Sequence, residues 1–265
     1  MPETFSEIIL HVDDRVAQVV INRPDKRNSL SKVTISELGT CLEHVANTPE
    51  IRVVELSGAG DKAFCSGADL STMFGGEPGA QDPVADHLAR GSLAGLFTQI
   101  WDLGKPVIAK VSGFCLAGGF GLAMACDIVY CSNDSVFGTP EINVGLWPYM
   151  ITVPLLNSMP PKVALELMMT GRRVGAQEAY DLGFVNKVFE TGQLDEQVAR
   201  ICRQLASRSP QAMKLGRGSF YSTLSGGRQD SLRYLQAMLS VTATSADAQE
   251  GIAAFLDKRQ PNWEK

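Results

Sequence analysis

The chain has 265 residues, an apolar fraction of 45%, a charged fraction of 20% and a formal net charge of −5. This composition is ordinary for a globular protein with a sizeable core, and the acidic balance argues against nucleic-acid binding, which needs a basic surface. No apolar run approaches the roughly 20 residues of a membrane span, and the N-terminus lacks a secretory-signal pattern, so we expect a cytoplasmic protein with no membrane partner.

The first part of the chain predicts a hairpin, a loop, a helix and a strand. Residues 7–12 and 16–22 are rich in Val and Ile and flank Asp13-Asp14, which is turn chemistry. The polar loop 23–28 follows. Apolar residues then recur at helical spacing, and Thr34 with Glu37 predicts a capping box for that helix. Residues 52–56 form a short apolar strand.

A second round repeats strand and helix. Residues 106–111 predict a strand, 119–125 a helix and 128–131 a third strand. This alternation is typical of an α/β fold with a largely buried sheet. Between the two rounds, residues 71–86 are rich in Gly and Pro, which predicts a long loop acting as a lid.

Beyond residue 158 the pattern is helical. Pro160-Pro161 predicts the start of a helix and Gly171 its end. Further helical patterns cover residues 176–182, 194–207, 211–215, 229–239 and 246–257. We therefore expect an α/β core over residues 1–195 and a helical region over 196–265 that packs on the core and on a neighbouring subunit.

The cysteines and histidines predict no metal centre. The three histidines are dispersed, and the cysteines show no CxxC spacing, so we interpret them as buried thiols. The six cysteines lie at positions 41, 65, 115, 126, 131 and 202.

A dinucleotide-binding fingerprint is matched only formally. Residues 58–63 read G-x-G-x-x-A after a strand, but 64–67 intervene where a helix would have to open. We interpret this segment as a turn.

Two other glycine-bearing segments predict backbone donors. Residues 63–70, AFCSGADL, place a glycine at a strand-to-helix junction that Asp69 can cap, and residues 113–127 repeat the theme with Gly118 and Gly119. N–H groups converging from two such loops form an oxyanion hole, whereas either loop alone is better interpreted as a tight turn with close helix packing.

Together with four further motifs, these loops resemble the crotonase superfamily, the enoyl-CoA hydratases and isomerases. The resemblance covers nearly the whole chain through motifs at residues 22–30, 61–70, 105–128, 135–146, 164–188 and 250–263. It implies a spiral of ββα turns and a helical C-terminal trimerisation region, giving a homotrimer or a dimer of trimers.

The resemblance also implies roles for particular residues. Oxyanion donors fall on the N–H groups of Ala68 and Gly118, and the substrate is an acyl-CoA thioester, with no permanently bound cofactor. Contacts to its CoA part are implied for Lys26 and Arg27, for Phe255 and Lys258 from a neighbouring subunit, and for Ser66, Ala68, Asp69 and Leu70.

The acid–base group departs from the hydratase pattern. Hydratases of the family carry two glutamates, of which Glu141 is present and the other is replaced by Gly121. We expect burial to raise the pKa of Glu141. The glycine is expected to leave space for a branched or cyclic acyl group. One glutamate suffices to move a proton between C2 and C4 of an enoyl thioester, so isomerisation is favoured over hydration.

Two alternatives remain at this point. A non-catalytic, acyl-CoA-binding member would keep the pocket without the chemistry. A thiol enzyme would use Cys65 or Cys115, although no histidine is placed by the sequence to activate either.

Overall fold

The fold is built from two sheets that the chain visits in turn. The computed structural model describes residues 5–69, 83–224 and 226–263. Strand β3 leads to β4, β5 to β6 and β7 to β8, so each turn contributes one strand to each sheet. The expected spiral of ββα turns is therefore confirmed.

The larger sheet has the order β1-β2-β3-β5-β7-β10, with an antiparallel β1–β2 hairpin and parallel pairing elsewhere. Its buried strands carry almost continuous apolar side chains, as expected for a sheet covered on both faces. The strands are β1 (Ile8–Asp13), β2 (Val16–Ile21), β3 (Val53–Gly58), β5 (Val107–Val111), β7 (Ile128–Ser132) and β10 (Lys187–Phe189).

The smaller sheet consists of four three-residue strands in the order β4-β6-β8-β9. Strands β4, β6 and β8 run parallel to one another, and β9 is antiparallel to β8. Their bounds are β4 (Ala63–Cys65), β6 (Phe114–Leu116), β8 (Val136–Gly138) and β9 (Arg173–Gly175). The sequence analysis gave bounds for none of these four strands, because three residues are too few to show a period.

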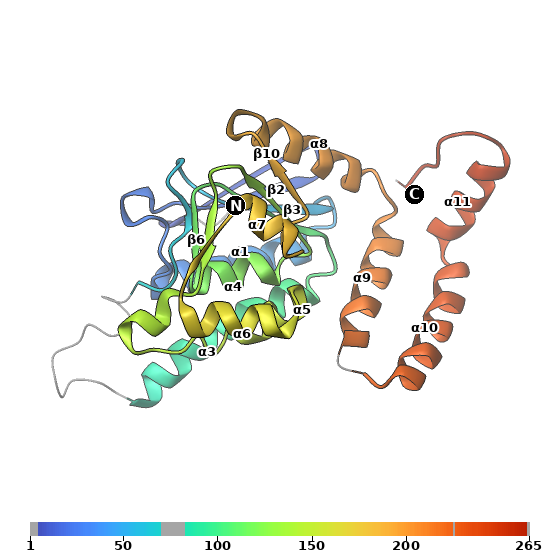
Figure 1. Ribbon diagram of the computed structural model, residues 1–265. Helices are drawn as coiled ribbons and strands as arrows, with labels where there is room; N and C mark the ends of the chain where they lie inside the picture. Colours follow the sequence, from blue (N-terminus) through green and yellow to red (C-terminus); the bar gives the residue numbers. More distant parts are fainter. Residues whose placement is uncertain (1–4, 70–82, 225, 264–265) are drawn as a thin grey trace.

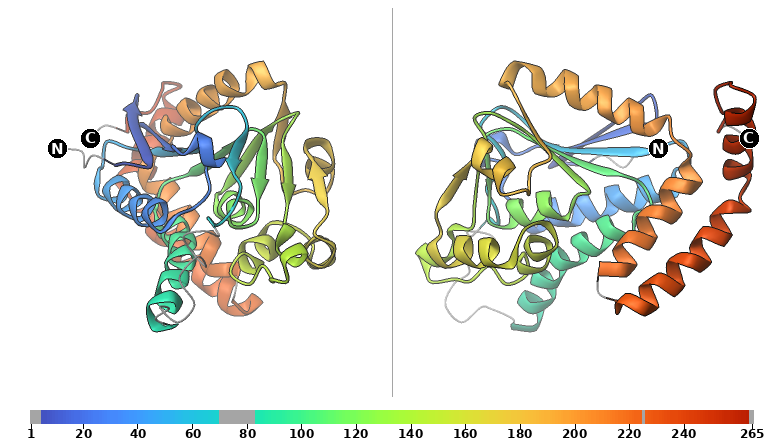
Figure 2. Two further views of the ribbon diagram at one scale, coloured as in Figure 1. Left: turned by 90° about the vertical axis from the view of Figure 1, so that its left-hand side faces the viewer. Right: turned by 45° about the vertical axis from the view of Figure 1, so that its right-hand side comes forward.

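Helices cover both faces of the larger sheet (Figures 1 and 2). Helix α8 lies on one face, where Val198 and Cys202 pack with Val53 and Ile108; α1, α3 and α4 lie on the other. The helices are α1 (Lys32–Asn47), α3 (Pro83–Asp102), α4 (Gly118–Ala125), α5 (Thr152–Ser158), α6 (Pro161–Thr170), α7 (Ala176–Asp181), α8 (Leu194–Ala206), α9 (Pro210–Leu224), α10 (Arg228–Ala243) and α11 (Ala246–Leu256).

Two local predictions are corrected. The capping box of α1 is formed by Ser31 and Thr34, because the Ser31 hydroxyl accepts the Thr34 N–H at 3.0 Å; Glu37 accepts the N–H groups of Ser6 and Glu7 instead. Residues 83–86 of the expected lid begin α3, a helix whose signal was weakened by Gly91 and Gly95. The rest of the expected lid, residues 71–82, lies outside the described residues.

The C-terminal helices project from the core as an arm (Figure 1). The boundary expected between residues 195 and 196 falls inside α8, whose packing belongs to the core; the projecting arm begins at α9. Gly171 ends α6 in a left-handed conformation, as predicted. No helix among the described residues is long and apolar enough to cross a membrane.

A buried ion pair fastens this arm to the core. Arg217 of α9 donates to both carboxylate oxygens of Asp127, at 2.8 and 2.9 Å, and to the carbonyl oxygens of Trp101 and Ile100. The Tyr221 hydroxyl donates to the same carboxylate at 2.6 Å, and burial with the neighbouring Asp127 charge raises the pKa of Tyr221.

Removing this arginine is expected to destabilise the protein. Breaking a buried pair from one side leaves an unpaired charge, so Arg217→Met is expected to lower the free energy of unfolding by about 2–3 kcal/mol, measured by urea denaturation. The exposed Arg203→Met serves as the control and should change it by less than about 0.5 kcal/mol. Equal effects of the two variants would contradict the role of the pair.

Candidate active site

The candidate site is assembled at the carboxyl ends of three neighbouring parallel strands. Ser66 and Ala68 follow β4, Ala117 and Gly118 follow β6, and Glu141 follows β8. Because β4, β6 and β8 are adjacent in the smaller sheet, their ends bring these segments together, as is usual for ligand sites in open α/β sheets. The Ala117 N–H donates to the Gly138 carbonyl at 2.9 Å and ties two of the ends together.

The two loops that carry the predicted oxyanion donors approach each other closely at Gly67. Gly67 has a φ of +99°, and a Cβ added there would lie 2.6 Å from the Ala117 Cβ. A Cβ added to Gly118 would lie 3.7 Å from the Ala68 nitrogen, so the two donor residues are neighbours. Only glycine at position 67 permits this approach.

Both proposed donors are available to a ligand. Within the part of the chain that the structure describes, no hydrogen-bond acceptor takes the N–H of Ala68 or of Gly118. Gly118 is the first residue of α4, where helical N–H groups have no partner in the helix. Ala117, just before it, has φ 50° and ψ −126°, a backbone conformation that is costly for a residue with a side chain and that sequence reasoning missed.

These residues line one cavity of about 410 Å³. Ser66, Ala68, Gly118 and Glu141, all predicted, share it. The other lining residues are mostly apolar and come from α3, from the segment after β6, from η2 (Pro140–Val144) and from the segment that follows η2: Leu93, Ala117, Pro140, Val144, Leu146, Trp147, Pro148, Tyr149, Met150 and Ile151.

Glu141 presents one unpaired carboxylate oxygen in this cavity. Its Oε2 is buried and has no hydrogen-bond partner among the described residues. Burial raises the pKa of the Glu141 carboxyl, as predicted, and a hydrogen bond from its own backbone amide offsets part of the rise. A carboxylate oxygen without a fixed partner in an apolar cavity is suited to accept and return a proton.

The expected space at Gly121 is absent, and this expectation was wrong. A Cβ on Gly121 would lie 2.2 Å from Ile151 Cγ2. The Ile151 side chain fills the volume that a side chain at position 121 would occupy. No pocket for a branched acyl group therefore opens there.

The thiol alternative is also unsupported by the structure. Cys65 and Cys115 are fully buried, and neither belongs to the described lining of the cavity. Burial raises the pKa of the Cys65 thiol to about 12 and that of Cys115 well above its ordinary value. Such thiols stay protonated and are poor nucleophiles.

The residues predicted to contact CoA do not lie together in the folded chain. Lys26 and Arg27 are exposed in the loop beside the first oxyanion segment, where the Arg27 carbonyl accepts the Ser66 N–H at 3.1 Å. Arg27 lies over the Phe114 ring, and so does Arg173, which the sequence analysis did not single out. Leu70 lies outside the described residues.

Phe255 and Lys258 lie far from this cavity within one chain. Both belong to the end of the arm, at and just after α11, which Figures 1 and 2 place well apart from α4 and β6. The Phe255 side chain is 82% exposed.

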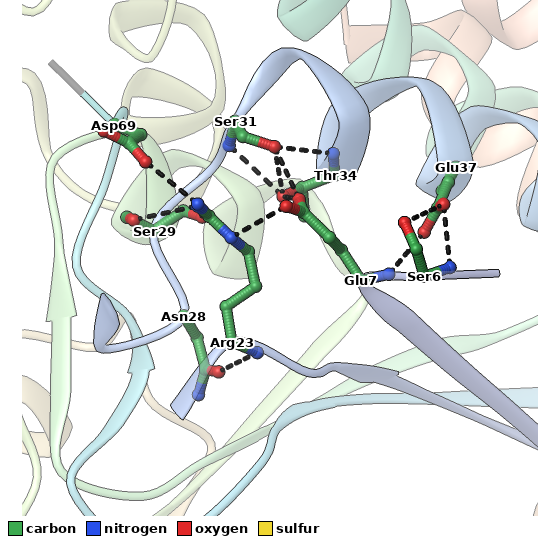
Figure 3. A network of polar contacts seen from close by, with 9 residues as sticks. All are labelled: Ser6, Glu7, Arg23, Asn28, Ser29, Ser31, Thr34, Glu37 and Asp69. Atoms are coloured by element: carbon green, nitrogen blue, oxygen red, sulfur yellow. Dashed lines mark hydrogen bonds and ion pairs between the residues drawn. The ribbon is translucent and has the colours of Figure 1, made fainter. Parts of the chain in front are cut away.

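Asp69 is held by an arginine-centred network (Figure 3). The Arg23 guanidinium contacts Asp69 at 3.0 Å, the Ser29 carbonyl at 2.5 Å and Glu7 at 3.1 Å. Glu7 in turn accepts the hydroxyls of Ser31 and Thr34 at the start of α1. The helix that Asp69 was expected to cap would begin outside the described residues.

The network predicts a positioning effect on the adjacent donor. Asp69→Asn weakens the ion pair by which Arg23 holds the segment that carries the Ala68 N–H. Because this N–H is then less well positioned, kcat is expected to fall roughly 10-fold with little change in KM. Steady-state kinetics measure both constants. A raised KM with unchanged kcat would instead favour the predicted contact of Asp69 with CoA. Glu37→Gln, at the far end of the network, is the matched control.

The fold and the cavity define an α/β protein whose two glycine-bearing loops meet beside one carboxylate, and comparisons with known proteins identify its family. The enoyl-CoA hydratase/isomerase family model matches residues 11–265. The chain belongs to this family, also known as the crotonase superfamily.

Several relatives and solved structures are similar over almost the entire chain. Carnitinyl-CoA dehydratase of Proteus mirabilis is 36% identical, covering 96% of this chain and 97% of the relative; that of Escherichia coli K12 is 34% identical over 94% of each. Human enoyl coenzyme A hydratase domain-containing protein 3 superposes with a TM-score of 0.91 at 32% identity, covering 97% of this chain and 100% of that one. An enoyl-CoA hydratase structure from Mycobacterium smegmatis gives 0.91 at 29% identity, with 98% and 100% covered.

Proposed function

We propose that this enzyme forms the enolate of an enoyl-CoA thioester and uses Glu141 to move one proton between C2 and C4. The thioester oxygen would accept the N–H groups of Ala68 and Gly118, which stabilise the negative charge as it develops. Glu141 takes a proton from one carbon, the double bond shifts, and the same proton returns to the other carbon.

The observation that carries this proposal is the single carboxylate. Among the described lining residues of the cavity, Glu141 is the only acidic side chain. One base that takes and returns a proton is sufficient for isomerisation, whereas hydration also requires a water molecule to be held and deprotonated.

Dehydration of a 3-hydroxyacyl-CoA thioester, with the reverse hydration, is the second candidate. The names of the similar carnitinyl-CoA dehydratases favour it. In that reaction Glu141 would remove the C2 proton and deliver it to the hydroxyl leaving C3, so that water is released. A non-catalytic acyl-CoA-binding role is the alternative from another class, and the unpaired buried Oε2 of Glu141 argues against it.

The test offers the purified protein matched 2-enoyl-, 3-enoyl- and 3-hydroxyacyl-CoA thioesters and follows double-bond migration and water addition separately. Migration faster than hydration supports isomerase chemistry. Rapid interconversion of 2-enoyl and 3-hydroxyacyl thioesters without migration would establish the second candidate. Binding of every thioester with conversion of none would establish the non-catalytic role.

The pH profile gives an independent prediction. Glu141 acts as a base only when ionised, and burial raises its pKa above the ordinary value of 4.5. Lowering the pH through this raised pKa protonates the base, so kcat/KM for migration is expected to fall on an acidic limb that lies above pH 4.5. A profile that stays flat down to that pH would contradict a buried carboxylate base.

We further propose that the arm forms a homotrimer, or a dimer of trimers, and that Phe255 and Lys258 reach the CoA part of a neighbour's substrate. The support is the exposed apolar surface of the last two helices, which a second copy would cover. Its large exposed side chains are Leu232, Leu235, Leu239, Ile252, Phe255 and Leu256. Analytical ultracentrifugation tests the assembly, and a monomer would contradict it.

A further inference from the structure

Helices α4 and α5 interlock where Gly121 meets Ile151. A Cβ on Gly121 would lie 2.2 Å from Ile151 Cγ2 and 2.6 Å from Ile151 Cβ, with Phe97 Cζ at 3.3 Å. Ile151 is only 3% exposed and directly precedes α5. Carbon atoms in a packed core do not approach so closely, so no side chain fits at position 121 while Ile151 keeps its place.

Ile151 also forms part of the catalytic cavity. It belongs to the described lining together with Ala68, Gly118 and Glu141, whereas Gly121 does not. A side chain from position 121 would have to enter the volume that Ile151 occupies. The isoleucine therefore presents an apolar wall where α4 could otherwise supply a functional group.

The apolar wall also disfavours the binding of a water molecule in the cavity. A bound water is held by about two to four polar partners, and the aliphatic atoms of Ile151, Leu93, Val144 and Leu146 offer none. Hydration transfers the oxygen of a water molecule to C3, passes one of its protons to a base and places a proton on C2. Glu141, the one acidic residue of the described lining, would have to act as the base for the water and as the proton carrier for the carbon.

We propose that Ile151 determines the fate of the enolate by keeping a second carboxylate and an activated water out of the cavity. The proton on Glu141 then returns to carbon, and the double bond migrates. This inference rests on the proposed function and names the residue that limits it to isomerisation.

A glutamate introduced at position 121 is expected to support hydration only if Ile151 is replaced as well. Gly121→Glu alone forces a carboxylate against Ile151 and should yield no hydration. Gly121→Glu combined with Ile151→Ala removes the obstruction and admits the carboxylate, so hydration of crotonyl-CoA is expected to rise about 10²-fold over the unmodified enzyme. The control Gly121→Gln with Ile151→Ala has the same shape without a base and should gain little.

The experiment measures hydration and migration in all of these variants. A gain confined to the glutamate double variant supports the inference. An equal gain in Gly121→Glu alone would overturn the role of Ile151. So would no gain in a folded double variant that still isomerises; either outcome leaves the proposed function unaffected. If the unmodified enzyme isomerised no thioester, the proposed function would be wrong. Fast hydration by the unmodified enzyme would overturn both the proposed function and the role of Ile151.

If the double variant does not fold, the single substitution Ile151→Ala tests whether this residue keeps water out of the cavity. Ile151→Ala opens the wall to solvent, so during migration in D2O the product is expected to take up several times more deuterium than with the unmodified enzyme. Leu155→Ala removes an equally large buried side chain from α5, the helix that Ile151 precedes, but outside the described cavity lining, and should not raise the uptake. Equal uptake in Ile151→Ala and the unmodified enzyme would overturn the inference.

Discussion

Replacing Glu141 by glutamine is expected to lower kcat for double-bond migration about 10²–10⁴-fold, because the amide cannot accept the proton that the carboxylate takes. The two side chains have the same shape, so the binding of CoA thioesters should be unchanged. The Oε2 of Glu141 has no partner to lose among the described residues, and the fold should remain at least as stable. Single-turnover kinetics with an equilibrium binding measurement separate the two effects.

The controls for this variant address the remaining alternatives. Cys65→Ala, at a buried thiol next to the oxyanion segment, should retain turnover. If Glu141→Gln left turnover unchanged while Cys65→Ala abolished it, the carboxylate mechanism would be wrong. A protein that binds thioesters equally well in both forms and turns over none would be a binding member of the family.

Replacing Ala68 by proline is expected to remove one oxyanion donor without dismantling its loop. Proline has no N–H, and loss of one such donor typically lowers the rate about 10²–10³-fold. The main-chain bonds around Ala68 use other groups: the Leu30 N–H donates to the Gly67 carbonyl at 2.8 Å, and the Asp69 N–H donates to the Leu30 carbonyl at 2.9 Å. Ala68 is not among the described residues with a positive φ, the sign of φ that a proline ring excludes.

The matched control is Ala68→Gly, which removes the methyl group but keeps the N–H. It is expected to retain most of the turnover, whereas Ala68→Pro loses it mainly in kcat because the donor acts on charge that develops in the transition state. Circular dichroism and thermal unfolding establish that both variants fold. Equal kcat values for the two would show that the Ala68 N–H does not stabilise the enolate.

The active-site motifs could be recognised from the sequence because their chemistry depends on local residue types. Gly67 must adopt a positive φ, and Gly118 must expose its N–H at a helix start, so both are visible as glycines after short apolar strands. Glu141 follows Pro140 after an apolar strand, and its raised pKa follows from the burial that its neighbours predict. The long strands and the helical C-terminal third were likewise readable from their periods.

The pairing of these short segments into a smaller sheet was not readable in this way. Its strands β4, β6, β8 and β9 have three residues each, too few for alternation to be distinguished from a turn. They nevertheless decide where the site forms, because the order β4-β6-β8 is what aligns the three loop segments. Pairing between residues about 50 positions apart, such as Cys65 with Cys115, is a property of the folded chain alone.

The contrast is sharpest at Gly121. From the sequence alone, a glycine at that position means a missing carboxylate and, as a natural interpretation, an open space. The first conclusion stands because it concerns which atoms the residue has. The second is wrong because free volume depends on what packs there, and Ile151, 30 positions further along the chain, fills it. The sequence by itself determined the chemical groups, and only the tertiary structure decided their neighbours and the shape of the cavity.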